Sequence, residues 1–339
     1  MENYQDKARG MLLGLAIGDA LGAPIEFGYT SDTIRQLGSK LEFFTDSPRG
    51  NKGEWTDDTS MALCIADSLL EKKGYDSYDI MNKFVRWADY GYHSADNKPA
   101  TDIGNQTKKA LDDYKKYPSI ARDEIETDQA GNAPIMRLAP IIIANTSAEK
   151  SEITPEIITP TLKMAELSAR ETHNSQAAKA VTEMFASMLY CAIHGLDKIN
   201  IAGYCARFLT EDDYTRFYLQ NSEQLIDRAL SSTDTGLRDR GGYIVDTFTI
   251  ALWGLIHGEN FKDGMLKVLQ LGGDTDTNAA CYGQIAGAFY GLNSIPIEWV
   301  SGVYESKEIT ELADKLLAMP ECPIIRTRFE DDEHFEELK

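Results

Sequence analysis

The chain has no excess of positive charge, no cysteine pairs and no long apolar run, and each absence excludes a class of protein. Its 339 residues contain 34 Lys and Arg against 54 Asp and Glu, which gives a formal net charge of −20. Proteins that bind nucleic acid or anionic membrane surfaces need fields of Lys and Arg, so we expect no nucleic-acid partner. A phosphate-bearing ligand would need a local positive source, such as an arginine, a helix N-terminus or a metal ion.

The five cysteines are scattered along the chain, and no Cys-X-X-Cys pair occurs. This excludes a disulfide framework and a zinc ribbon, and it predicts reduced thiols in the cytoplasm. The N-terminal apolar run from Met11 to Ile17 contains Gly14 and is followed at once by Asp19, which is not typical of a secretory signal. No stretch approaches about 18–20 consecutive apolar residues, so we expect no membrane insertion.

Helical periodicity dominates the chain, whereas alternating strand patterns are nearly absent and no glycine-rich phosphate loop occurs. Apolar residues at three-four spacing predict one helix over 177–192, stopped by Gly195, and another along 61–69. A third helix is predicted with Asp246 as its N-cap and Gly258 at its end. Loops are expected at 91–106, 117–134 and 145–160. We predict an all-α fold with one domain over residues 1–328 and an acidic C-terminal tail over 329–339.

Two segments carry glycine at every fourth position, and these glycines are Gly10, Gly14, Gly18 and Gly22, then Gly283, Gly287 and Gly291. Residues four apart share one face of a helix, so each series predicts a flat helix face. An interior glycine costs about 1 kcal/mol of helix propensity relative to alanine, and close approach to a neighbouring helix would offset that cost. Two such helices could bring their adjoining loops close together.

Two short acidic motifs are the strongest chemical signal. Residues 53–59 read Gly-Glu-Trp-Thr-Asp-Asp-Thr, and residues 272–278 read Gly-Gly-Asp-Thr-Asp-Thr-Asn. Both stand just before a helical pattern, so they could be two independent helix caps. If the loops meet instead, four carboxylates share one site and need divalent cations, and oxygen ligands favour Mg²⁺, Mn²⁺ or Ca²⁺ over Zn²⁺. The residues alone leave both interpretations open.

Three motifs in order resemble the ADP-ribosylglycohydrolase family. They are residues 14–22 (Gly-Leu-Ala-Ile-Gly-Asp-Ala-Leu-Gly) with Glu26-Phe27, then Thr56-Asp57-Asp58-Thr59, then residues 272–277. The resemblance runs from about Ala8 to about Gly291. It implies a compact all-α fold, a centre of two divalent cations (Mg²⁺ or Mn²⁺), and hydrolysis of the bond that joins ADP-ribose to an acceptor.

The resemblance also implies roles for individual residues. The implied metal ligands are Thr56, Asp57, Asp58, Asp274, Asp276 and Thr277. Glu26 and Asp57 are the implied catalytic carboxylates. The implied substrate-binding residues are Asp102, Gly104, Asn105, Gly131, Asn132, Met136, His173 and Tyr243. Arg137, which ends the loop after Gly131, could bind phosphate or form an internal ion pair.

Asp102 matches the acidic residue that faces the guanidinium in the arginine-specific branch of that family. The predicted function is therefore removal of ADP-ribose from ADP-ribosylated arginine on a protein, with ADP-ribose as product. Two alternatives stay open. One is the same chemistry on another linkage or carrier, such as serine, a nucleic-acid end or a free metabolite. The other is a non-enzymatic, crystallin-like member, although a scaffold does not need clustered carboxylates.

Overall fold

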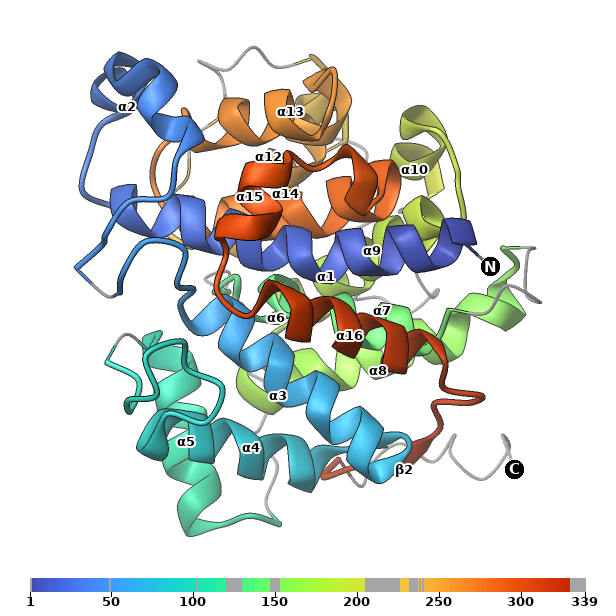
Figure 1. The fold of residues 1–339 in the computed structure, drawn as a ribbon. Helices are drawn as coiled ribbons and strands as arrows, with labels where there is room; N and C mark the ends of the chain where they lie inside the picture. Colours follow the sequence, from blue (N-terminus) through green and yellow to red (C-terminus); the bar gives the residue numbers. More distant parts are fainter. Residues whose placement is uncertain are drawn as a thin grey trace.

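The computed structural model describes residues 2–48, 50–101, 103–119, 130–146, 153–204, 226–231, 237, 239 and 241–329. These residues form helices joined by short loops, with one two-stranded parallel pairing, so the all-α prediction is confirmed (Figure 1). The predicted acidic tail lies outside the described residues except for Phe329, and the division into domain and tail stays a prediction.

The elements follow in this order: α1 (Glu2–Gly22), η1 (Ala23–Ile25), α2 (Ser31–Leu37), η2 (Gly38–Glu42), α3 (Asp57–Lys72), β1 (Tyr75–Asp76), α4 (Ser77–Tyr90), α5 (Asn105–Lys116), α6 (Ala133–Met136), α7 (Ala139–Ala144), α8 (Pro155–Thr172), α9 (Gln176–Ile193), α10 (Lys198–Tyr204), α12 (Ile244–His257), α13 (Phe261–Leu269), α14 (Thr275–Tyr290), η4 (Leu292–Ser294), α15 (Ile297–Gly302), α16 (Ser306–Leu317) and β2 (Ile324–Arg326).

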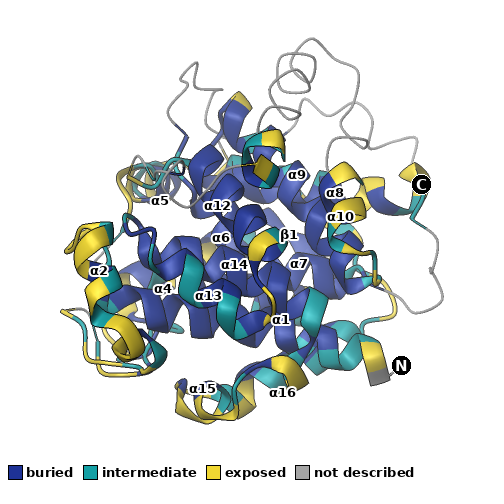
Figure 2. Ribbon diagram, turned by 90° about the horizontal axis from the view of Figure 1, so that it is seen from above, coloured by how far each residue is buried: buried dark blue, intermediate teal, exposed yellow. Residues whose placement is uncertain are grey.

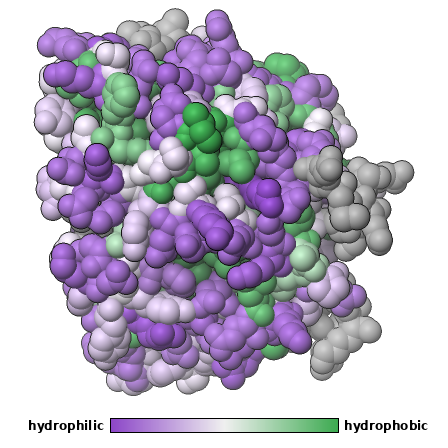
Figure 3. Space-filling model, in the orientation of Figure 1, coloured by the Kyte–Doolittle hydropathy of each residue, from purple (hydrophilic) through white to green (hydrophobic). Residues whose placement is uncertain are grey.

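Helix α1 crosses the middle of the molecule and packs against α14, α16 and α3, although α14 and α16 belong to the other end of the chain (Figure 1). Helices α9, α12 and α14 are buried along almost their whole length, as their dark colour in Figure 2 shows, whereas α2 and α16 keep an exposed face. The face drawn in Figure 3 is mostly hydrophilic, with apolar side chains gathered in small groups.

The glycine series form the contact between α1 and α14. A Cβ atom built on Gly18 would lie 2.1 Å from the carbonyl oxygen of Ala279, and one on Gly14 would lie 2.3 Å from that of Gly283. In the opposite direction, a Cβ on Gly287 would lie 1.9 Å from the carbonyl oxygen of Gly10. Since no side chain fits between these backbones, the predicted close packing of both glycine helices is confirmed.

Three predicted helices are present, with some corrected boundaries. Helix α9 matches the helix predicted over 177–192, Gly195 follows it with φ +88°, and α3 contains the segment 61–69. Asp246 is not the N-cap of α12, because that helix already begins at Ile244 with Tyr243 as N-cap. Asp246 lies instead in the first turn, 3.8 Å from the guanidinium of Arg228.

Two other expectations need correction. The loop predicted over 145–160 is wrong in its second half, because α8 begins at Pro155, where the ring costs no hydrogen bond in the first helical turn.

The segment Asn3–Ile25 is long and apolar enough to cross a membrane by length and composition alone. The search for consecutive apolar residues did not find it, because glycines and Asp19 interrupt the run. However, 89% of that window is buried, as in a core helix packed between α14 and α16.

Candidate metal centre and adjoining cleft

The two acidic motifs lie at the N-termini of α3 and α14, but the N-cap residue of neither helix caps it through its side chain. Thr56 is the N-cap residue of α3 and Asp274 that of α14, and the side chain of neither makes a capping hydrogen bond. The hydroxyl of Thr56 donates to Asp19 on α1, and the carboxylate of Asp274 accepts from the amide of Asn132. Independent capping therefore does not explain the motifs, and the interpretation of two loops that meet is supported.

Asp19 holds the first motif in place. Its Oδ1 accepts from the backbone N–H and the hydroxyl of Thr56 at 2.9 and 2.8 Å. Its Oδ2 accepts from the backbone N–H and the hydroxyl of Thr59 at 3.0 and 2.7 Å. With two hydrogen bonds on each oxygen, this carboxylate orients the start of α3, which leaves the neighbouring Asp57 and Asp58 available for other partners.

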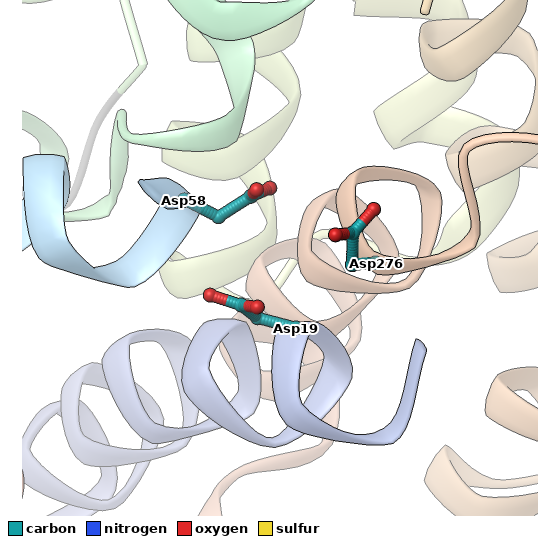
Figure 4. Close-up of side chains that lie close together, drawn as sticks. All are labelled: Asp19, Asp58 and Asp276. Carbon is teal, nitrogen blue, oxygen red and sulfur yellow. The ribbon is translucent and has the colours of Figure 1, made fainter. Parts of the chain in front are cut away.

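The close packing of α1 on α14 brings the acidic residues together. Asp19 from α1, Asp58 from α3 and Asp276 from α14 are all buried and each has an oxygen within 4.8 Å of the others (Figure 4). Glu26, Asp274 and Asp276 form a second group within the same limit, so Asp276 belongs to both. The hydroxyl of Thr277 donates to Asp58 at 3.4 Å and links the two motifs directly.

Burial raises the pKa of Asp58 well above its usual range, and the charges of Asp19, Asp57 and Asp274 raise it further. Burial and then the neighbouring charges of Asp274 and Asp58 act in the same direction on the pKa of Asp276. Burial also raises the pKa of Asp19, against the hydrogen bonds from Thr59 and Thr56. These carboxylates therefore repel one another, so either some of them are protonated or cations lie between them when all are ionised.

The donor set fits hard divalent cations. The two groups offer carboxylate oxygens, and the hydroxyl oxygen of Thr277 lies beside them; such ligands suit Mg²⁺, Mn²⁺ and Ca²⁺. The two groups share Asp276, and their carboxylates come from α1, α3, the start of α14 and the segment after η1, so there is room for two neighbouring cations. The mutual repulsion of these clustered carboxylates gives the physical reason why a cation would bind there.

A cavity of about 790 Å³ opens beside this cluster. Its lining contains twelve of the residues singled out from the sequence, namely Glu26, Asp57, Gly104, Asn105, Gly131, Asn132, Met136, His173, Tyr243, Asp274, Asp276 and Thr277. The structure thus brings most of the predicted metal and substrate residues to one place. Thr56 and Asp58 do not line the cavity, since Thr56 is turned toward Asp19 and Asp58 is 1% exposed beneath the surface. Asp102, which carries the specificity prediction, lies outside the described residues.

The far wall of the cavity is built from two loops that pair with each other. Gly131 and Tyr243 form an antiparallel bridge, and the N–H of Asn132 donates to the carbonyl of Gly242 at 3.0 Å. The amide of Asn132 also donates to Asp274 at 2.9 Å, so this wall is connected to the acidic cluster. A Cβ atom on Gly131 would lie 2.8 Å from Nε2 of His173, which explains the glycine next to that ring.

Sequence reasoning missed several residues of the site. Asp19 was present in the Gly-Asp-Ala motif but received no role, and its side-chain contacts with residues 37 and 40 positions away could not be read locally. Asp239 was missed entirely, and the only local signal is an acidic residue just before a Gly-Gly turn. Phe27, Gln106, Thr107, Ala130, Ala133, Gly241 and Gly242 also line the cavity.

Arg137 is not a phosphate ligand of the cleft. Its side chain is fully buried and donates to the carbonyl of Ser168 at 3.0 Å and the hydroxyl of Thr172 at 2.8 Å. Burial lowers the pKa of Arg137 to about 10. The structure therefore supports an internal role for Arg137, in which its guanidinium donates hydrogen bonds to α8 and does not face a phosphate in the cleft.

With the fold and the cleft defined, comparison with known proteins gives a consistent result. Residues 1–323 match the family described as ADP-ribosylglycohydrolase. The chain belongs to the ADP-ribosylglycohydrolase family. A solved structure titled ADP-ribosylglycohydrolase-related protein complex superposes with a TM-score of 0.72 at 32% identity, covering 94% of this chain and 99% of that one.

The names of curated relatives of this chain refer to more than one target. The ADP-ribosylarginine hydrolase Tri1 of Pseudomonas putida is 33% identical, with 93% of this chain and 79% of Tri1 covered. The ADP-ribosyl-[dinitrogen reductase] glycohydrolase of Rhodospirillum rubrum is 29% identical over 94% of this chain and 97% of its own length. The ADP-ribosylhydrolase ARH3 of Danio rerio is 26% identical, with 92% and 91% covered. Family membership supports hydrolase activity and a requirement for metal.

Proposed function

We propose that this chain is a divalent-metal-dependent hydrolase that removes ADP-ribose from ADP-ribosylated arginine on a protein, with the machinery within residues 1–328. The observation that carries the proposal is the cavity of about 790 Å³, in which predicted substrate residues and buried carboxylates share one space. The similarity to Tri1, a relative named for arginine-linked substrates, supports the choice of linkage.

The proposed metal ligands are Thr56, Asp57, Asp58, Asp274, Asp276 and Thr277. Two cations, Mg²⁺ or Mn²⁺, would supply positive charge that positions ribose hydroxyls and makes water more acidic. Asp19 has the supporting task of holding Thr56 and Thr59 through four hydrogen bonds.

The protein's own residues divide the remaining work. Glu26 and Asp57 both line the cavity, and either carboxylate can accept the proton of an attacking water. The water oxygen becomes bonded to C1 of the ribose as the C1–N bond to the guanidine breaks, and the guanidine takes up a proton. Positive charge develops on the sugar during this step, and the surrounding carboxylates stabilise it. Gly104, Asn105, Gly131, Asn132, Met136, His173 and Tyr243 would hold the ADP-ribose.

Specificity for arginine is assigned to Asp102. A carboxylate facing a guanidinium forms a charge-assisted hydrogen bond worth about 1.5–3 kcal/mol, whereas a serine acceptor offers no positive charge.

Cys64, Cys191, Cys281 and Cys322 are free thiols, which supports the further proposal of a reducing, cytoplasmic setting.

The test is a release assay on two peptides, one carrying ADP-ribosyl-arginine and one carrying ADP-ribosyl-serine, with EDTA, Mg²⁺ or Mn²⁺. We expect free ADP-ribose from the arginine peptide only when a divalent cation is present, and little from the serine peptide. Asp276→Asn should abolish release, while Asp32→Asn, which changes an exposed aspartate on α2, should leave it unchanged. Equal release from both peptides would favour the alternative linkage suggested by the similarity to ARH3, and no release from either would favour the non-enzymatic alternative.

A further inference from the structure

Asp239 lies between the cleft wall and the acidic cluster and is bonded to both. Its Oδ1 accepts from the backbone N–H groups of Gly241 and Gly242 at 2.8 and 3.0 Å. Its Oδ2 accepts from the backbone N–H of Asp274 at 2.7 Å and from the side-chain amide of Asn278 at 2.9 Å. One carboxylate therefore fixes two segments that are distant in the sequence.

The two segments have different tasks in the site. Gly241 and Gly242 line the cavity, whereas Asp274 is the N-cap residue of α14 and belongs to the acidic cluster. The glycine segment does not owe its backbone conformation to a helix or strand, since Gly241 and Gly242 have positive φ, at +85° and +78°. Their orientation depends on a partner that collects their N–H groups, and Asp239 is that partner.

The approach of Asp239 to the metal-side loop is unusually close. A Cβ atom on Gly273 would lie 2.6 Å from the Cβ of Asp239, so only glycine fits at that position. Gly273 itself has φ +81°. A cation that tightens the loop around Asp274 would thus act on Asp239, and through its other oxygen on Gly241 and Gly242.

We infer that Asp239 is a positioning residue that couples cation binding at the acidic cluster to the order of the cleft wall at Gly241 and Gly242. The inference rests on the metal centre of the proposed function and adds a connection between that centre and the wall. By linkage, a cation that orders the wall favours substrate binding, and a substrate that orders the wall favours the cation by the same factor.

The substitution Asp239→Asn tests the coupling because an amide has one acceptor oxygen in place of two. Its NH₂ group would face two N–H donors, so either the glycine side or the Asp274 side loses its acceptor. The matched control is Asp76→Asn. Asp76 is a buried aspartate, whereas Asp239 is half-buried, and the Oδ1 of Asp76 likewise accepts from two backbone N–H groups, those of Tyr78 and Asp79 at the start of α4, outside the cleft.

The measurement is amide hydrogen exchange at Gly241 and Gly242 in the full chain, with EDTA and with Mn²⁺. In the parent protein we expect Mn²⁺ to slow exchange at both amides by about fivefold or more. In Asp239→Asn we expect less than about twofold slowing, even at Mn²⁺ concentrations that saturate the site by calorimetry, while Asp76→Asn behaves like the parent.

Two outcomes overturn the inference. One is a parent protein in which Mn²⁺ does not slow exchange at these amides, a result that needs no variant to fold. The other is an Asp239→Asn variant that keeps the full effect. A protein that shows the coupling but releases no ADP-ribose keeps the inference and loses the proposed function. If the parent protein releases ADP-ribose while Asp239→Asn keeps the full slowing of exchange by Mn²⁺, the proposed function stands and the inference about Asp239 is lost.

Discussion

Replacing Gly18 tests whether direct contact between two backbones maintains the metal centre. In Gly18→Ala the new methyl group would lie 2.1 Å from the carbonyl oxygen of Ala279, so α1 and α14 must move apart locally by roughly 1 Å. Overpacking of this kind costs about 1–3 kcal/mol, while alanine returns up to about 1 kcal/mol of helix propensity. We expect a net loss of about 1–2 kcal/mol in the free energy of unfolding, and a larger loss for Gly18→Leu.

The same substitution should weaken cation binding. Asp19 follows Gly18 directly on α1, and Asp276 lies in the first turn of α14, less than one turn before Ala279. Separation of the helices therefore widens the cluster of Asp19, Asp58 and Asp276. Denaturant unfolding followed by circular dichroism gives the stability, and calorimetry with Mn²⁺ gives the affinity.

Gly203→Ala is the matched control, because Gly203 lies in α10 and a Cβ there meets nothing within 4 Å. It should be neutral or slightly stabilising, by up to about 1 kcal/mol. If Gly18→Ala unfolds at the same denaturant concentration as the parent, the packing argument is refuted.

Three further predictions concern the charged residues of the site. Asp276→Asn should lose bound Mn²⁺ and hydrolysis while keeping the parent's far-ultraviolet circular dichroism, and retention of full metal content would contradict the shared role of Asp276 in both acidic groups. Without divalent cations, the elevated pKa of Asp58 makes the folded protein more stable at low pH. This contribution to the free energy of unfolding is fully present below the ordinary carboxyl pKa of about 4, and it is lost as the pH rises through the elevated pKa. The EDTA-treated parent should therefore lose melting temperature with rising pH more steeply than Asp58→Asn, and parallel curves would oppose this account. Asp102→Asn should lower kcat/KM for ADP-ribosyl-arginine by about tenfold or more, equivalent to ~1.4 kcal/mol, and change the Kd of free ADP-ribose much less, whereas an equal loss for both would assign Asp102 to holding its turn.

The helices could be predicted where their signals are local. In α9 the apolar residues recur at helical spacing, and Gly195 has the positive φ that ends such helices. Both signals come from residues in or next to the helix, so the helix and its C-terminal end could be predicted. The start of α8 was missed because a segment rich in Ser, Thr and Pro is typical of a loop. Pro155 is nevertheless compatible with the first turn of a helix, and only the packing around α8 decides between the two.

The candidate site shows the same division between local and distant information. The Thr-Asp motifs at 56–59 and 274–277 could be found because each is contiguous. The roles of Asp19 and Asp239 depend on N–H groups contributed by residues up to 40 positions away, and no periodicity encodes those contacts. Arg137 illustrates the opposite error, since its place beside a loop residue suggested a ligand, while its side chain lies in the core.

The contact between α1 and α14 also determines when, during synthesis of the chain, α1 can pack in its native position. During synthesis α1 leaves the ribosome long before its partner α14 exists, and nine-tenths of its most apolar window is destined for burial. Until α14 is made, the glycine-lined face of α1 has no native surface to cover it, which favours transient binding by chaperones. The acidic cluster cannot form until then either, because Asp276 belongs to that late segment. A chain that ends before α14 therefore lacks the complete acidic cluster.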